Sequence, residues 1–187
     1  MKKHFRTVLY LAVLFLVSGV ASQLRAQGFE LGAQLAVQSL PELGETHAGY
    51  GFRFTYSGYP PFLALDSEIN LFPTSSNGNL GETQVFVGLR AGVHVHRWGV
   101  YAKLRPGFED FGGGGFPQRL TSGTHFALDI GGVIEYDVVP LVALRLDLSD
   151  VLTDFGGAML LAGPGYVGAP LHTQHNFQTT IGVVVRF

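Results

Sequence analysis

The sequence has no cysteine, few charged residues and no long hydrophobic run, and each shortage excludes a class of protein. Without cysteine, the chain can be neither held by disulfides nor anchored through an acylated cysteine. Only 14 % of its 187 residues are charged, which is low for a soluble domain of this length. Yet no apolar stretch reaches the roughly 20 residues that a membrane-spanning helix needs. A membrane protein that crosses by β-strands would meet both conditions.

The longest apolar run, Val8–Val17, lies near the N-terminus, between basic residues and small residues. This order is typical of a secretory signal peptide, so we predict that residues 1–26 are cleaved after Ala26, with Ala21 and Ser22 as alternative sites. An uncleaved anchor is the competing interpretation. Cleavage would remove four positive charges and change the formal net charge from −2 to −6, which argues against a nucleic-acid partner.

Eight later segments alternate apolar residues with polar or small ones, the period of a β-strand with two different faces. Each has about the 9–11 residues that a tilted strand needs to cross hydrocarbon. Pro106 lies on the apolar face of the fifth segment and predicts a bulge or an irregular strand end there. The eight segments are 29–38, 48–56, 63–71, 84–95, 100–108, 126–136, 142–149 and 177–187.

The polar faces of these segments distinguish a membrane barrel from a soluble β-sandwich. They carry six acidic and six basic side chains among many glycines, which suits a closed interior that neutralises itself. We therefore predict an interior ion network formed by Glu30, Arg53, Asp66, Glu68, Arg90, Lys103, Arg105, Asp129, Glu135, Arg145, Asp147 and Arg186.

The links between the segments and the aromatic residues favour the same choice. Links of alternating length are typical of transmembrane barrels, with short turns in the periplasm and long loops outside. The predicted long links are 39–47, 73–83, 109–124 and 150–175, and the short ones are 57–61, 97–99 and 137–141. Aromatic residues are expected at both membrane interfaces: Phe29, Tyr56, Tyr59, Phe62, Trp98, Tyr136 and Phe187 at the periplasmic one, and Tyr50, Phe72, Phe108, Phe126 and Phe177 at the outer one.

The last strand ends on Phe187, and it resembles the closing strand of bacterial outer-membrane barrels, in which a terminal Phe is part of the assembly signal. With its signal peptide and eight strands, the chain resembles the small outer-membrane β-barrel family that includes the OmpA transmembrane domain and OmpX. This resemblance implies an all-β, eight-stranded, antiparallel up-and-down transmembrane barrel over residues 27–187. It also implies an outer-membrane location, lipid and lipopolysaccharide as surroundings, and the barrel-assembly machinery as a partner. The fold does not transfer a function, because family members are structural, adhesive or enzymatic.

We predict a monomeric, non-catalytic protein without a cofactor, with a structural or surface-interaction role. A narrow pore is the first alternative, although eight-stranded barrels are normally filled by side chains. The second alternative, a lipid A-modifying enzyme, lacks its nucleophile: His125 is followed two residues later by Ala127 where a Ser is required. His94 and His96 have a spacing that could hold a metal, but hydrogen bonding inside the barrel is the preferred interpretation.

Two features of the outer links bear on recognition. One is an acidic group that could bind divalent cations and so bridge to lipopolysaccharide, although solubility alone would also explain it: Glu42, Glu45, Glu82, Glu109, Asp110, Asp150 and Asp154. The other is the uncharged stretch 155–171, because exposed apolar surface tends to mark contact sites. We predict that this longest link recognises an unknown surface partner through Met159, Leu160, Leu161 and Tyr166.

Overall fold

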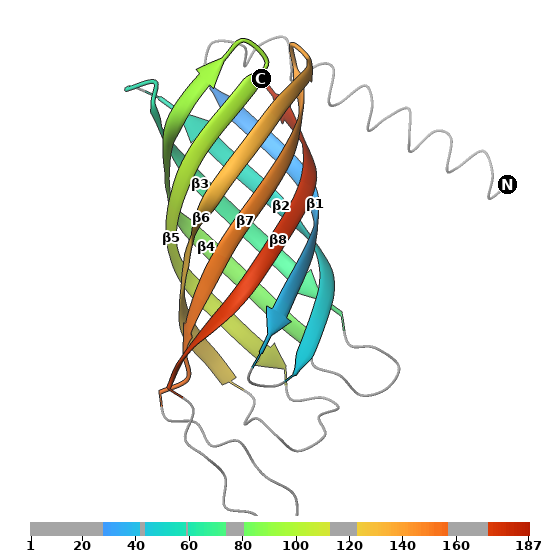
Figure 1. The fold of residues 1–187 in the computed structure, drawn as a ribbon, viewed down its shortest axis with the longest axis vertical. Helices are drawn as coiled ribbons and strands as arrows, with labels where there is room; N and C mark the ends of the chain where they lie inside the picture. The colour runs from blue at the N-terminus through green and yellow to red at the C-terminus, as the bar shows by residue number, and fades with distance from the viewer. Residues whose placement is uncertain (1–27, 42–43, 59, 74–80, 113–122, 157–171) are drawn as a thin grey trace, which may run out of the picture.

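The computed structural model describes residues 28–41, 44–58, 60–73, 81–112, 123–156 and 172–187, and they form one closed antiparallel β-barrel (Figure 1). Each strand pairs with its neighbours in sequence, and β1 pairs with β8 to close the barrel. The strands are β1 (Phe29–Leu40), β2 (Glu45–Ser57), β3 (Leu63–Phe72), β4 (Gly81–Val95), β5 (Trp98–Gly112), β6 (Gly123–Val139), β7 (Val142–Asp154) and β8 (Thr173–Arg186). The predicted fold class is therefore confirmed.

The two faces of every strand differ as the alternation predicts. On the outside, Leu35 and Ile181 are 64 % and 58 % exposed, which is the apolar wall that a hydrocarbon surrounding requires. On the inside, Asp66 and Arg105 are fully buried. The barrel is thus inverted relative to a soluble protein, with its charged residues in the core.

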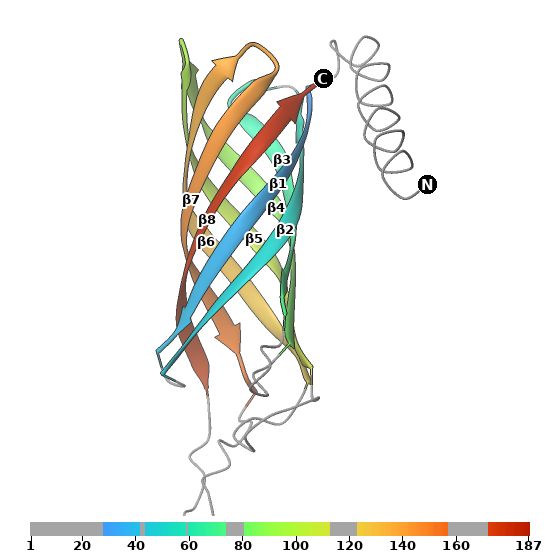
Figure 2. The ribbon, with the colours of Figure 1, turned by 90° about the vertical axis from the view of Figure 1, so that its right-hand side faces the viewer.

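The barrel has two distinct ends. The short links 58–62, 96–97 and 140–141 lie at the end where β1 begins and β8 finishes, and we call it the periplasmic end. At the opposite, outer end, β1, β3, β5 and β7 finish and β2, β4, β6 and β8 begin, so that the outer links are 41–44, 73–80, 113–122 and 155–172. Figure 2 shows the strands tilted steeply between the two ends. In the described stretches of chain, no helix is long and apolar enough to cross a membrane.

Several strands extend further at the outer end than the sequence predicts. The pairing of β1 with β2 continues to Leu40 and Glu45, so the first outer link is only 41–44 and the prediction of a long link there is wrong. Phe72 was expected among the outer aromatic residues facing lipid. It points into the barrel instead and is 1 % exposed, because β3 keeps its alternation to its last residue.

The bulge predicted as one possibility at Pro106 is absent, because β5 continues through it to Gly112 in one register, but the β4–β5 pairing is interrupted there. Two residues of β4 opposite this point, Val87 and Gly88, are skipped in the β4–β5 pairing, which resumes unshifted on both sides. The missing N–H of proline is therefore accommodated without an extra residue. A register shift occurs instead in β6, between Asp137 and Val139.

Pairs of aromatic residues lie on the lipid-facing side of the barrel, near both of its ends. At the periplasmic end, the ring centroids of Phe29 and Tyr56 are 4.9 Å apart and those of Trp98 and Tyr136 are 4.8 Å apart. At the outer end, Phe108 is about half exposed and packs edge-on against Phe126, with centroids 6.1 Å apart. These pairs have the placement of the aromatic girdles that mark membrane interfaces.

Candidate functional site

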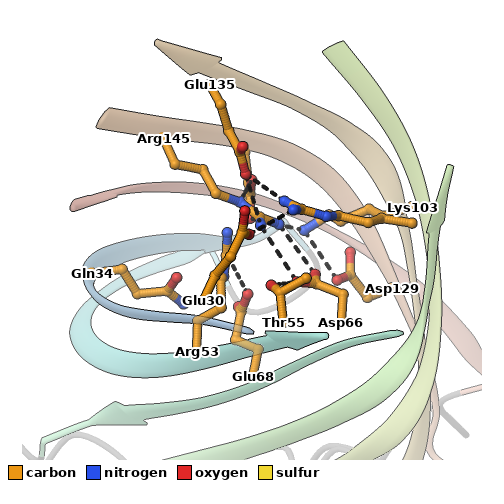
Figure 3. A network of polar contacts seen from close by, with 12 residues as sticks. Glu30, Gln34, Arg53, Thr55, Asp66, Glu68, Lys103, Asp129, Glu135 and Arg145 are labelled. Atoms are coloured by element: carbon orange, nitrogen blue, oxygen red, sulfur yellow. Dashed lines mark hydrogen bonds and ion pairs between the residues drawn. The ribbon is translucent and has the colours of Figure 1, made fainter. Parts of the chain in front are cut away.

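The barrel interior holds the densest polar chemistry of the described residues, and we treat it as the candidate functional site. The structure places all twelve residues of the predicted ion network there, from all eight strands. Figure 3 shows part of this network. Eleven of the twelve are at most 7 % exposed, and Arg186 lies at the periplasmic mouth. The interior divides into a periplasmic group, a middle layer and an outer layer.

The middle layer contains eight charged residues in mutual contact: Arg53, Asp66, Glu68, Lys103, Arg105, Asp129, Arg145 and Asp147. The guanidinium group of Arg105 donates from Nε to Asp129 Oδ2 at 2.8 Å and from Nη1 to Asp66 Oδ2 at 2.8 Å. The same Nη1 lies 2.9 Å from Glu68 Oε2. Such charge-assisted bonds to several carboxylates compensate the cost of burying a guanidinium group.

The middle layer crosses the lumen, as the dashed contacts in Figure 3 show. Arg53 on β2 pairs with Asp147 on β7. Arg145 on β7 donates from Nη2 to Asp66 Oδ2 on β3 at 3.1 Å. Because these strands are not neighbours, the ion pairs join opposite walls and fill the space between them.

Glycines make room for these long side chains at the wall. Gly88 of β4 faces the interior beside Arg105. A Cβ at this position would lie 2.5 Å from the Cα and 3.0 Å from the Cγ of Arg105, both too close. A larger residue at this position would therefore displace Arg105, which bonds three carboxylates of the layer.

The periplasmic group continues the network toward the mouth. Glu30 accepts from Arg90 Nη2 at 2.6 Å and from Arg186 Nε at 2.9 Å. Arg186 also donates to Glu135 Oε2 at 2.7 Å and to Asp137. His94, which was considered as a metal ligand, has its Nε2 3.0 Å from Asp137 Oδ2 and its Nδ1 3.3 Å from the Tyr101 hydroxyl.

The structure assigns His94 and His96 different environments. His96 lies in the two-residue link 96–97 with φ 57°, and its carbonyl oxygen is 3.2 Å from His94 Nε2. Over the part of the chain that the structure describes, no group of three His, Asp or Glu side chains could hold a metal ion.

The outer layer is built differently, from amides and two carboxylates. Glu82 and Glu109 are 2 % and 0 % exposed, and both accept from the same atom, Gln84 Nε2, at 2.8 and 2.7 Å. His47 Nδ1 lies 3.1 Å from Glu82, and Thr153 donates to Glu109. No ion pair between these two glutamates and a Lys or Arg is present among the described residues.

Sequence reasoning missed the inward orientation of three carboxylates. Glu82 and Glu109 were predicted to belong to an acidic outer rim, and this is wrong because both are buried in the barrel. Asp137 was placed in a turn but bonds to Arg186 inside the mouth. Among the described residues the interior thus holds nine acidic and six basic side chains. The alternation in the sequence could have shown this orientation. Glu82 lies two residues from the inward-facing Gln84, and Asp137 lies two residues from the inward-facing Glu135.

The remaining acidic rim residues face outward or lie outside the described side chains. Asp110 and Asp154 are exposed, and Asp150 pairs with His175, with 2.7 Å between Oδ2 and Nδ1. Glu42 lies outside the described residues, as does the side chain of Glu45.

Aromatic side chains pack together in the interior next to the outer layer, toward the outer end. The ring of His125 lies 5.9 Å from that of Phe111 and 4.8 Å from that of Phe155, measured between centroids. Phe111 and Phe155 are almost fully buried, and so is Phe86 below them, over which the Arg105 guanidinium lies at 5.9 Å. His125, the nearest match to a deacylase histidine, therefore faces the interior rather than lipid.

The predicted signal peptide, residues 1–26, and the candidate recognition residues Met159, Leu160, Leu161 and Tyr166 lie outside the described residues. Phe187 is described. Its backbone N–H donates to the carbonyl oxygen of Phe29 at 2.9 Å, so the predicted assembly signal lies at the β1–β8 seam.

The sequence matches no protein-family model and no curated protein. The structure, however, resembles solved barrels over most of its length. Neisserial surface protein A is 15 % identical, with 86 % of this chain and 97 % of that one covered and a TM-score of 0.53. Outer membrane protein H (OprH) from P. aeruginosa is 13 % identical, with 86 % and 99 % covered and a TM-score of 0.59. The N-terminal β-barrel domain of Pseudomonas aeruginosa OprF is 10 % identical, with 86 % and 99 % covered and a TM-score of 0.54.

The chain has the fold of a small outer-membrane β-barrel. This agrees with the resemblance drawn from its closing strand and with the predicted outer-membrane location. At these identities the likeness concerns the fold alone, and function has to be argued from the interior and the surface.

Proposed function

We propose that this protein is a non-catalytic, monomeric outer-membrane barrel whose filled interior serves as a rigid support for structural or surface-recognition segments at the outer end. The observation that carries this proposal is the set of ion pairs across the lumen in the middle layer. Arg53 joins β2 to β7 and Arg145 joins β7 to β3, so that each side chain is held from two walls. A barrel cross-linked in this way supports its links and does not favour transport.

Planar-bilayer recording tests the filled interior against the narrow-pore alternative. The parent protein is expected to give no discrete conductance steps. A variant in which Arg53 and Asp147 are both replaced by Ala serves as the positive control, because it removes both members of a pair that crosses the lumen. Steps of defined size from the folded parent would contradict the proposal. A comparison of lipid A from expressing and non-expressing cells addresses the enzymatic alternative, and we expect identical lipid A.

The recognition part of the proposal rests on the uncharged composition of residues 155–171. Replacing Met159, Leu160 and Leu161 by Ser-Asn-Ser should leave folding and heat-modifiable gel migration unchanged, while reducing adherence of expressing cells to a polystyrene surface. The matched control replaces Val138 and Val139, two exposed apolar residues at the periplasmic end, by Ser. Equal adherence of both variants, each well folded, would remove this link from consideration.

A further inference from the structure

Two grooves lie on the outer wall of the barrel, one above the other, over strands β1 and β2. The periplasmic groove has a volume of ≈ 540 Å³ and is lined by Phe29, Phe54, Tyr56, Ser57 and Leu65, with glycine backbone at its rim. The mid-wall groove has a volume of ≈ 500 Å³ and is lined by Ala33, Leu35, Tyr50, Phe52, Ile181 and Val183, among others. Both volumes fall within the about 300–1,000 Å³ typical of ligand sites.

The mid-wall groove exists because one small residue stands among large ones. Ala33 points outward and is paired in register with Phe52 on β2 and Val183 on β8. Figure 2 shows β8, β1 and β2 side by side on one wall. The surrounding Phe52 and Ile181 side chains are 59 % and 58 % exposed and stand above the alanine as the walls of the groove.

The two grooves follow one continuous outward row. In register, Phe29 faces Tyr56, Leu31 faces Phe54 and Ala33 faces Phe52. Ala33 lies four residues from Phe29, which is about 13 Å along the strand at about 3.3 Å per residue. This places the mid-wall groove within the roughly 30 Å hydrocarbon layer and the periplasmic groove at its edge.

The chemistry of the lining changes along this row. The periplasmic groove offers the Tyr56 hydroxyl and backbone groups beside the Phe29 and Tyr56 rings, whose centroids are 4.9 Å apart. The mid-wall groove is lined almost entirely by apolar side chains. A polar and aromatic rim followed by an apolar groove reproduces the order of parts in a phospholipid, from the glycerol and headgroup to the acyl chain.

We propose that the β1–β2 wall binds one phospholipid of the periplasmic leaflet. Its glycerol and headgroup region lies in the groove beside Phe29 and Tyr56, and one acyl chain lies in the groove above Ala33. A second copy of the protein is the competing occupant of this wall. A phospholipid fits better because the two grooves, of ≈ 540 and ≈ 500 Å³, have the size of small-ligand sites and follow each other in the order of the parts of one lipid molecule.

The test uses protein in nanodiscs that contain a small fraction of phospholipid with a photoactivatable diazirine at mid-chain, followed by peptide mapping of the cross-links. For the parent, cross-links are expected mainly on β1, β2 and β8. Ala33→Leu fills the mid-wall groove and should lower labelling of these strands at least five-fold. The matched control, Ala102→Leu on β5, makes the same change at another outward-facing alanine that lines neither groove, and it should leave labelling unchanged.

Even labelling around the barrel, or labelling that Ala33→Leu does not reduce, would overturn the proposal. Protein–protein cross-links through β1 and β2 in place of lipid would assign the wall to a second copy, and would overturn it equally. If Ala33→Leu fails to fold, Ala33→Val fills the groove less, and a labelling intermediate between parent and background is then expected. Unchanged labelling of folded Ala33→Val would contradict the site.

Discussion

The middle and outer layers of the barrel interior are both buried and both rich in carboxylates, yet they satisfy their polar groups by different means. In the middle layer, Glu68 accepts from the guanidinium groups of Arg53 and Arg105. In the outer layer, Glu109 accepts from neutral donors: the amides of Gln38 and Gln84 and the hydroxyl of Thr153. The comparison teaches that a barrel can fill its interior either with interlocked charges or with amides and hydroxyls.

The two solutions respond differently to the loss of one group. Removing one partner of a buried ion pair leaves an unpaired charge and costs about 3–5 kcal/mol. A neutral hydrogen bond contributes only about 0.5–1.5 kcal/mol, and an amide can replace a carboxylate within it. We therefore expect the middle layer to dominate stability, and the outer layer to tolerate substitution.

The largest effect is expected from Arg145→Leu in the middle layer. Arg145 bonds Asp66, Glu135 and Asp147, and its loss leaves these carboxylates short of a partner. Unfolding in urea from liposomes should show a loss of about 3–5 kcal/mol in the free energy of unfolding. Arg97→Leu, in an exposed periplasmic link, is the control and should cost little. A similar cost at both positions would refute the importance of the network.

A somewhat smaller loss in the free energy of unfolding is expected from Leu146→Arg, one residue after Arg145 on β7. Leu146 points outward and lies in register between Ile134 on β6 and Ile181 on β8. Leu146→Arg would place a charge in the hydrocarbon, at a cost of about 2–4 kcal/mol near mid-membrane. The same urea titration measures it. If neither this substitution nor Arg145→Leu changes the unfolding midpoint, the assignment of the two faces is wrong.

A smaller loss in the free energy of unfolding is expected from a change at the end of the chain. Deleting Phe187 removes one backbone hydrogen bond at the β1–β8 seam, worth about 0.5–1.5 kcal/mol. Assembly should suffer more than stability, with less folded protein in the outer membrane and more degraded in the periplasm. Phe187→Asp should lower the yield of folded protein in the same way as the deletion. Phe187→Tyr, which keeps an aromatic ring, should give the yield of the parent protein. Equal yields from all variants would argue against a role of the terminal aromatic in assembly.

The sequence predicts the barrel well because alternation is a local property that each strand carries by itself. It predicts the strand ends poorly, because Glu82 and Glu109 resemble loop residues unless the alternation is extended to them. The twelve network residues could be named from their parity alone. Their ion-pair partners could not be predicted in this way. Arg53 and Asp147, for example, are 94 residues apart in sequence, and their contact depends on how far the two side chains reach across the lumen.

The proposed difference between the layers is tested most directly by making the same substitution in each. Glu68→Gln and Glu109→Gln both replace a buried carboxylate by its amide isostere, at 3 % and 0 % exposure. Their free energies of unfolding are to be measured in the same liposomes. We predict that Glu68→Gln costs about 1.5–3 kcal/mol, the range for hydrogen bonds to charged groups, and that Glu109→Gln costs less than about 1 kcal/mol. Equal costs, or a larger cost for Glu109→Gln, would contradict the conclusion that interlocked charges in the middle layer hold the barrel together.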